Sequence, residues 1–91
     1  MKITFSQHAL QQMFRRNITV EDIKTAISSG DTIQDYRDDK PYPSRILLYF
    51  KNKVPLHVVY AVNRLDNEII VITAYHPDEN LWSADFRTKK N

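Results

Sequence analysis

The chain has 91 residues and a mass of 10.8 kDa. This is the size of one domain, so residues 1–91 are expected to share a single hydrophobic core. With 42% hydrophobic and 26% charged residues, the composition is typical of a globular protein and excludes intrinsic disorder. The lack of cysteine excludes disulfides and thiolate chemistry, and one glycine is too few for a dinucleotide or P-loop motif. No apolar run reaches the length of a membrane span, so we expect a cytoplasmic protein.

The net charge of +2 hides alternating blocks of charge along the chain. Residues 1–20 carry +3, 21–39 carry −4, 40–64 carry +5, 65–86 carry −5 and 87–91 carry +3. If the basic blocks meet on one face of the fold, they form a surface that attracts phosphate. The alternative is a solvated surface of mixed sign.

The first predicted element is a helix from the N-cap residue Ser6 to about Arg16. Apolar side chains at helical spacing fill one arc of this segment, which indicates a face packed in the core. His8, Gln12 and Arg16 follow one another at intervals of four residues, so they share a polar stripe at the edge of that arc. This stripe is the first place where side chains suited to chemistry gather.

A second helix is predicted between Thr19 and Gly30. Thr19 and Asp22 have the spacing of a capping box, and glycine is common at a helix end. Beyond Gly30 the hydrophobic period becomes strand-like. Four strands are expected, at Thr32–Tyr36, Ile46–Phe50, Leu56–Val62 and Glu68–Tyr75.

Helices followed by strands in this order predict an α+β fold. Because the last three strands are joined by short turns, they should form an antiparallel meander. We therefore expect two N-terminal helices packed on one face of a small antiparallel sheet of about four strands. Trp82 is expected to fasten the C-terminal segment to the core.

Five groups of residues, in order along nearly the whole chain, carry a resemblance to a known family. They are Ser6–Ala9 with Met13, Arg16 and Ile18; Tyr42–Ser44; Pro55–Val59; Ile72–Asp78; and Trp82 with Arg87. In this pattern the chain resembles the bacterial domain of unknown function 4258. That family is similar to the small RNase toxins of the RelE and barnase-like group, which implies a RelE-like fold of two helices and an antiparallel sheet.

The resemblance implies the toxin component of a toxin-antitoxin pair, acting as a metal-independent, RNA-cleaving endoribonuclease of the mRNA interferase type. It also implies two partners, RNA and a cognate antitoxin protein. Antitoxins encoded beside members of this family, similar to those of the MqsR type, often carry a zinc-binding domain with paired cysteines. Because a chain this short has marginal stability, a homodimer is also considered. No cofactor and no membrane partner are implied.

Metal-free RNA cleavage needs a base for the 2′-hydroxyl, an acid for the departing 5′-oxygen and cations for the phosphorane charge. Histidine suits both proton transfers because its ordinary pKa lies near neutrality, so His8 and His57 are the candidate catalytic pair. Arg16 could clamp the phosphate, and Tyr75 could donate to it or stack on a base. Equally, His57 could be a core histidine, Tyr75 a core aromatic and Arg16 a surface residue.

A further set of basic residues is predicted to bind RNA phosphates. It comprises Arg15, Arg45, Lys51, Lys53, Arg87, Lys89 and Lys90. The alternative is that these side chains only keep the surface soluble. The family that the chain resembles usually has an arginine at the position of Gln12, so this chain lacks one candidate phosphate ligand.

Other chemistries find less support in the sequence. The three histidines lack the spacing of metal ligands, and no HExxH or paired-cysteine motif occurs, so no metal site is predicted. Asp35, Asp38 and Asp39 could work as paired carboxylates, although such a run in a loop is usually just solvated. The alternative to an enzyme is a catalytically silent module of the same fold that binds nucleic acid or a protein.

Overall fold

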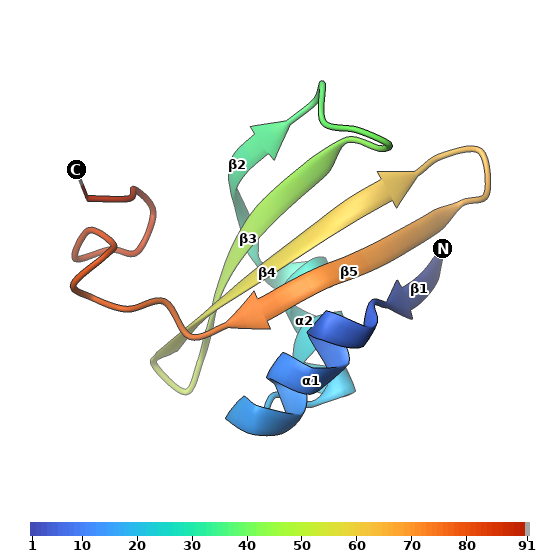
Figure 1. Ribbon diagram of the computed structural model, residues 1–91. Coiled ribbons are helices and arrows are strands. Elements are labelled where there is room, and N and C mark those ends of the chain that lie inside the picture. Colours follow the sequence, from blue (N-terminus) through green and yellow to red (C-terminus); the bar gives the residue numbers. More distant parts are fainter. Residues whose placement is uncertain (91) are drawn as a thin grey trace.

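Two helices and five strands follow one another along residues 1–90, the part of the chain that the computed structural model describes (Figure 1). Their bounds are β1 Lys2–Phe5, α1 Gln7–Arg16, α2 Val20–Ser29, β2 Asp31–Tyr36, β3 Ser44–Lys51, β4 Val54–Asn63 and β5 Glu68–Tyr75. The strand order is β1-β5-β4-β3-β2, with β2 to β5 antiparallel and β1 parallel to β5. The predicted α+β class and both helices are confirmed, and the sheet has one more strand than expected.

The additional strand is β1. Its four residues precede the first helix and pair with the start of β5, with Lys2 opposite Glu68 and Phe5 opposite Val71. So short a segment shows no clear hydrophobic period of two, so the sequence pattern did not reveal it. The parallel pairing makes the sheet mixed, and it places the start of α1 beside β5.

Both helices begin at the predicted caps. The hydroxyl of Ser6 accepts a hydrogen bond from a backbone N–H in the first turn of α1, and Thr19 and Asp22 form a reciprocal capping box. Gly30 ends α2 at a close approach, because a Cβ there would lie 2.6 Å from the carbonyl oxygen of Ala26. Within residues 1–90, neither helix is long and apolar enough to cross a membrane.

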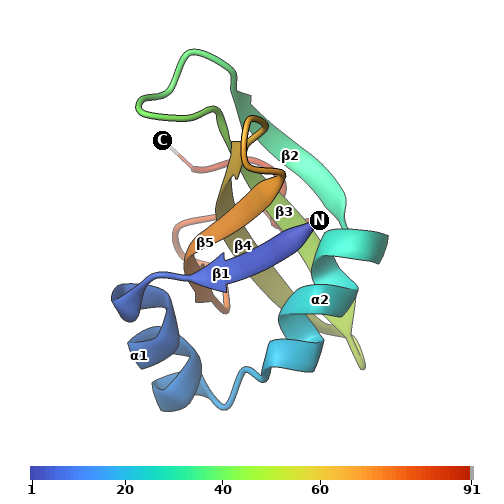
Figure 2. The same cartoon turned by 90° about the vertical axis from the view of Figure 1, so that its right-hand side faces the viewer.

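The two helices cover one face of the sheet, and the hydrophobic core lies between the two layers (Figure 2). The buried side chains of this core are Ala9, Met13, Ile18, Ile23, Ala26, Leu47, Leu56, Val58, Tyr60, Ile69, Val71 and Ala74. Neighbouring side chains along a strand point to opposite faces. Because Leu56 and Val58 of β4 face the helices, the intervening His57 projects from the other face.

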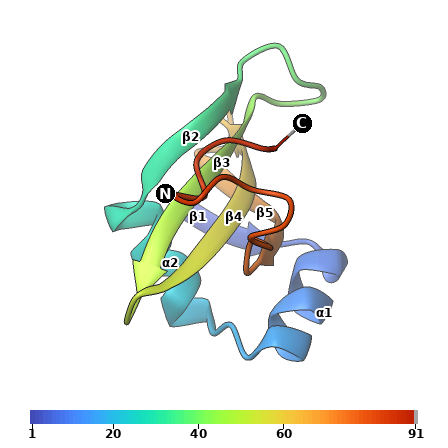
Figure 3. The ribbon, with the colours of Figure 1, turned by 90° about the vertical axis from the view of Figure 1, so that its left-hand side faces the viewer.

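Residues 78–90, named here the strap, cross that other face without forming a helix or a regular strand (Figure 3). Trp82 is only 8% exposed, so it fastens the strap to the sheet as expected from the sequence. The sheet is therefore covered by the helices on one face and, in part, by the strap on the other.

Candidate functional site

His57 on β4 is the most enclosed polar side chain beneath the strap, with no exposed surface. Its Nε2 lies 2.9 Å from the carbonyl oxygen of Phe86, and its Nδ1 lies 3.2 Å from the hydroxyl oxygen of Tyr75 on β5. Since a carbonyl oxygen can only accept, Nε2 carries the proton and Nδ1 accepts from the Tyr75 hydroxyl. Both ring nitrogens are thus engaged within the protein.

Aromatic rings complete the enclosure of His57. The Trp82 ring meets it edge-on with centroids 4.5 Å apart, and the Tyr75 ring does so at 5.3 Å. Burial lowers the pKa of His57 below its ordinary value of 6.5, against the opposing effect of the Phe86 carbonyl. Burial, and secondly the nearby Tyr36, raise the pKa of Tyr75 above 10.0. Both members of the pair are therefore neutral near pH 7.

Of the four expected catalytic residues, the structure brings only His57 and Tyr75 together. His8 is exposed on α1, which packs against the helix-covered face, whereas His57 lies beneath the strap on the opposite face. The two histidines therefore do not open onto one exposed groove. Arg16 ends α1 as an exposed residue and forms no ion pair with any of residues 1–90.

Two residues of the predicted RNA-binding set, Lys51 and Lys53, lie at the β3–β4 hairpin. The link after α1 and the β3–β4 hairpin together line a hollow of about 210 Å³, to which Asn17 and Lys51 both contribute. Lys53 is exposed in the same hairpin, and Arg15 lies in the last turn of α1. The Lys51 ammonium is already paired with Asp22, at 2.8 Å. Two basic side chains therefore share this hairpin, and one of them is neutralised by an ion pair.

The remaining predicted RNA-binding residues lie elsewhere. Arg45 on β3 is paired with Asp35, with Nε 3.7 Å from the carboxylate. Three others, Arg87, Lys89 and Lys90, belong to the strap, and the Arg87 guanidinium lies 2.7 Å from the carboxylate of Asp31 on β2. Arg45 and Arg87 are thus each paired with an acidic residue of the sheet.

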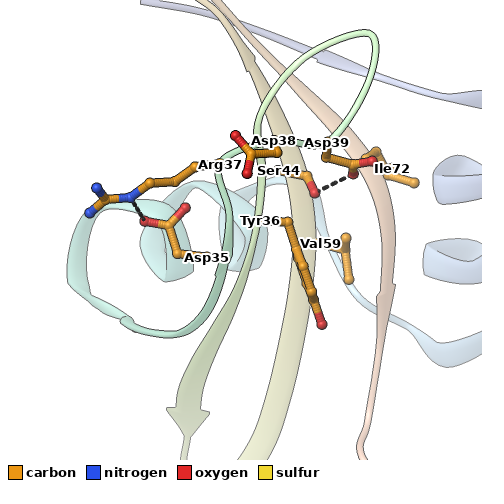
Figure 4. Close-up of a pocket in the computed structure, with 8 residues that line it drawn as sticks. All are labelled: Asp35, Tyr36, Arg37, Asp38, Asp39, Ser44, Val59 and Ile72. Atoms are coloured by element: carbon orange, nitrogen blue, oxygen red, sulfur yellow. Dashed lines mark hydrogen bonds and ion pairs between the residues drawn. The ribbon is translucent and has the colours of Figure 1, made fainter.

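A groove of about 710 Å³ opens on the same sheet face as His57 (Figure 4). Its lining consists of Asp35, Tyr36, Arg37, Asp38, Asp39, Ser44, Val59 and Ile72. Tyr36, Val59 and Ile72 come from three different strands and supply an apolar floor, where the tyrosine is 49% exposed and the isoleucine 38% exposed. Asp38 and Asp39 lie at the rim of that floor, whereas Asp35 and Arg37 turn away from Tyr36 and pair with each other (Figure 4).

A β-bulge explains why an isoleucine is exposed in this groove. Val59 pairs with Thr73 and Tyr60 with Val71, so Ile72 has no partner across the ladder. A bulge turns the extra side chain out of its regular alternation. The Ser6 hydroxyl donates to the carbonyl oxygen of Ile72 at 2.8 Å, so the cap of α1 also holds the bulge in place.

The carboxylates around the groove are held to different degrees. Asp39 accepts from the buried hydroxyl of Ser44 at 2.6 Å and from the backbone N–H of Lys40. The carboxylate of Asp35 forms ion pairs with both Arg37 and Arg45. Asp38 forms no hydrogen bond or ion pair with any of residues 1–90. The groove thus keeps a carboxylate available at its rim.

Sequence reasoning missed this groove because it treated the acidic run as a solvated loop. The usable signal was the position of Tyr36 next to the aspartates, directly after an expected strand. Within residues 1–90, no three histidine, aspartate or glutamate side chains gather where they could hold a metal ion. The groove offers a partner apolar contact and negative charge.

Comparison with known proteins gives one match. A search among curated proteins and a search among solved structures each found none. Residues 5–76 match the family model described as a domain of unknown function, DUF4258. This match covers most of the chain and includes both helices, β2 to β5 and the pair His57 and Tyr75. The chain therefore belongs to the DUF4258 family.

Proposed function

We propose that this domain is a protein-binding module whose groove holds a positively charged segment of a partner protein. The groove itself carries the proposal, because Asp38 and Asp39 stand at the rim of its exposed apolar floor, while the third carboxylate, Asp35, is paired with arginines. Apolar floors provide affinity, and charge around them selects partners of the opposite sign. A segment that alternates lysine or arginine with aliphatic side chains matches both features. RNA is less suited, because the groove would repel its phosphates.

The state of His57 supports the same proposal. A general base must reach the proton it removes, directly or through one water. His57 has no exposed surface, and both of its nitrogens are hydrogen-bonded to Tyr75 and Phe86. In this arrangement the pair contributes to the packing of the sheet face and has no access to a substrate.

Calorimetric titration of the full chain with a short synthetic peptide of alternating lysine and valine tests the proposal. We expect saturable binding, and none with a peptide that has glutamate at the lysine positions. Asp38→Asn should weaken binding by about threefold, the usual size for one exposed charge pair. Glu21→Gln is the matched control, because Glu21 is exposed on α2, away from the groove. Equal affinity for both peptides, or no binding of either, would contradict the proposal.

A second candidate function, RNA binding with cleavage, is favoured by the hollow between the α1–α2 link and the β3–β4 hairpin, where Lys51 contributes to the lining and Lys53 is exposed nearby in the hairpin. In this alternative the domain is the toxin component of a toxin-antitoxin pair. His57 and Tyr75 would then supply proton transfer once the strap has moved away. Cations near Lys51 would hold the phosphates, and the antitoxin would be the protein partner.

Incubating the purified chain with RNA in the presence of EDTA tests this second candidate. Cleavage that leaves 2′,3′-cyclic phosphate ends, and that His57→Ala reduces by about 10² or more, would establish it. Gln12→Arg restores the arginine that is usual in the family and should raise the rate if Gln12 limits activity. Intact RNA with the wild type and with Gln12→Arg would remove this candidate.

A further inference from the structure

The strap forms few polar links to the sheet beneath it. Only two of its hydrogen bonds within residues 1–90 reach the sheet: the Phe86 carbonyl accepts from His57, and Arg87 donates to Asp31. Its other backbone bonds close within the strap, as between Ser83 and Thr88. A segment that satisfies its own backbone in this way can leave the sheet without losing its internal bonds.

The contacts that do reach the sheet come from three strap side chains and one carbonyl group. Trp82 packs edge-on against His57, and Phe86 meets Phe50 of β3 with centroids 6.4 Å apart. Arg87 follows directly and forms the ion pair with β2 at 2.7 Å. The sheet face beneath the strap therefore has two aromatic contact positions, one N–H donor and one carboxylate acceptor.

Phe86 adopts a backbone conformation that residues with side chains rarely adopt. Its φ angle is 61°, in the left-handed region, and its carbonyl group is the one that accepts from His57. Such a conformation persists where surrounding contacts enforce it. The left-handed residue is thus the one whose carbonyl group makes the polar contact with His57.

The boundary of the family match separates the strap from the surface that it covers. The match ends at residue 76, before the strap begins, whereas His57, Phe50 and Asp31 all lie inside it. The covered surface therefore lies within the matched segment, and the strap lies after it.

From these observations we infer that the sheet face around His57 is a second docking surface, and that the strap is an internal ligand occupying it. Its external ligand is a segment of a partner protein that presents two aromatic side chains followed by an arginine, as Trp82, Phe86 and Arg87 do. Binding of this segment releases the strap. The inference goes beyond the proposed function, because this surface and the acidic groove have different lining residues.

Fluorescence of Trp82, the only tryptophan of the chain, reports directly on the strap. The probe is a synthetic peptide that copies residues 79–90 with the change Trp82→Phe, so that all tryptophan emission comes from the protein. Added to the full chain, it should shift the emission to longer wavelength in a saturable way, because the released ring enters water. A scrambled peptide of the same composition should leave the emission unchanged.

Three variants of the full chain sharpen the test. Arg87→Ala removes the ion pair with Asp31, so half-maximal release should need about threefold less peptide. Lys89→Ala removes the same charge from the strap without touching a contact to the sheet, and it should behave as the wild type. Asp38→Asn in the acidic groove should also leave release unchanged, which separates this inference from the proposed function.

Three kinds of outcome would overturn the inference. The first concerns the emission: either the scrambled peptide causes the same shift, or neither peptide causes a shift. Another is a shift accompanied by loss of helical circular dichroism, because the strap would then leave only when the domain unfolds. The third is formation of a dimer by the protein alone, detected by light scattering and abolished by Arg87→Ala, because the surface would then receive the strap of a second copy.

Discussion

The Tyr75 hydroxyl donates a hydrogen bond to Nδ1 of His57, across neighbouring strands and beneath the strap. The direction follows from the opposite side of the imidazole, where Nε2 must donate to the carbonyl oxygen of Phe86. This pair joins β4, β5 and the strap in one chain of polar contacts. Three of our stability predictions concern the buried polar groups on this face of the sheet.

Removing the hydroxyl should destabilise the fold. Tyr75→Phe leaves a buried imidazole nitrogen without a donor, which typically costs about 1–3 kcal/mol of the free energy of unfolding. Tyr36→Phe serves as the control, because Tyr36 is 49% exposed and water can replace any contact of its hydroxyl. Urea denaturation of the three proteins measures the difference. Equal stability of the two variants would show that the Tyr75 hydrogen bond adds nothing.

Burial of His57 predicts a pH dependence of stability. Its pKa is lowered in the folded protein, whereas an unfolded histidine titrates near 6.5, so the unfolded chain binds more protons just below that pH. The contribution to stability is complete above about pH 6.5 and is lost as the pH falls below it, by at most about 1.4 kcal/mol per pH unit.

Urea denaturation between about pH 7.5 and pH 5.5 tests this dependence. His57→Gln should flatten the curve because it removes the titrating group, whereas His8→Gln should retain it because His8 is exposed on α1. If the wild type and His57→Gln lose stability in parallel, the imidazole is not held in its neutral form by the fold.

Two aspartates of the groove should differ in their effect on stability: Asp39 should stabilise the loop, whereas Asp38 should matter only for binding. Asp39→Ala leaves the hydroxyl of Ser44, a residue only 3% exposed, without its acceptor and should cost about 1–3 kcal/mol. Asp38→Ala should change stability by no more than about 0.5 kcal/mol, because Asp38 is exposed and forms no bond within residues 1–90. A comparable loss in both variants would refute this division.

Much of the fold could be predicted because its signals are local. The hydroxyls of Ser6 and Thr19 mark helix starts within a few residues of sequence, and both caps were predicted and are present. The alternation along β4 likewise has a single period. The strand β1 was missed because its stability comes from pairing with β5, far along the chain.

The site was less predictable because it depends on contacts between distant parts of the chain. His57 was identified as a candidate, yet its alternation in the strand did not reveal that Phe86 and Trp82 would cover it. The exposure of Ile72 arises from a bulge, which depends on the pairing of β4 with β5. No short motif encodes either feature. The role of Asp38 at the rim of the groove likewise depends on the apolar floor beside it, which residues from three separate strands form.

Amide chemical shifts test most directly whether the acidic groove is the place where a partner binds. A ¹⁵N-labelled sample of the full chain would be titrated with the lysine-valine peptide and, separately, with a single-stranded RNA of arbitrary sequence. We expect the peptide to shift amides that line the groove, among them those of Tyr36, Ser44 and Ile72. The RNA should leave these unshifted. Peptide shifts absent from the groove, or RNA shifts spreading from Asn17 and Lys51 to His57, would contradict the account.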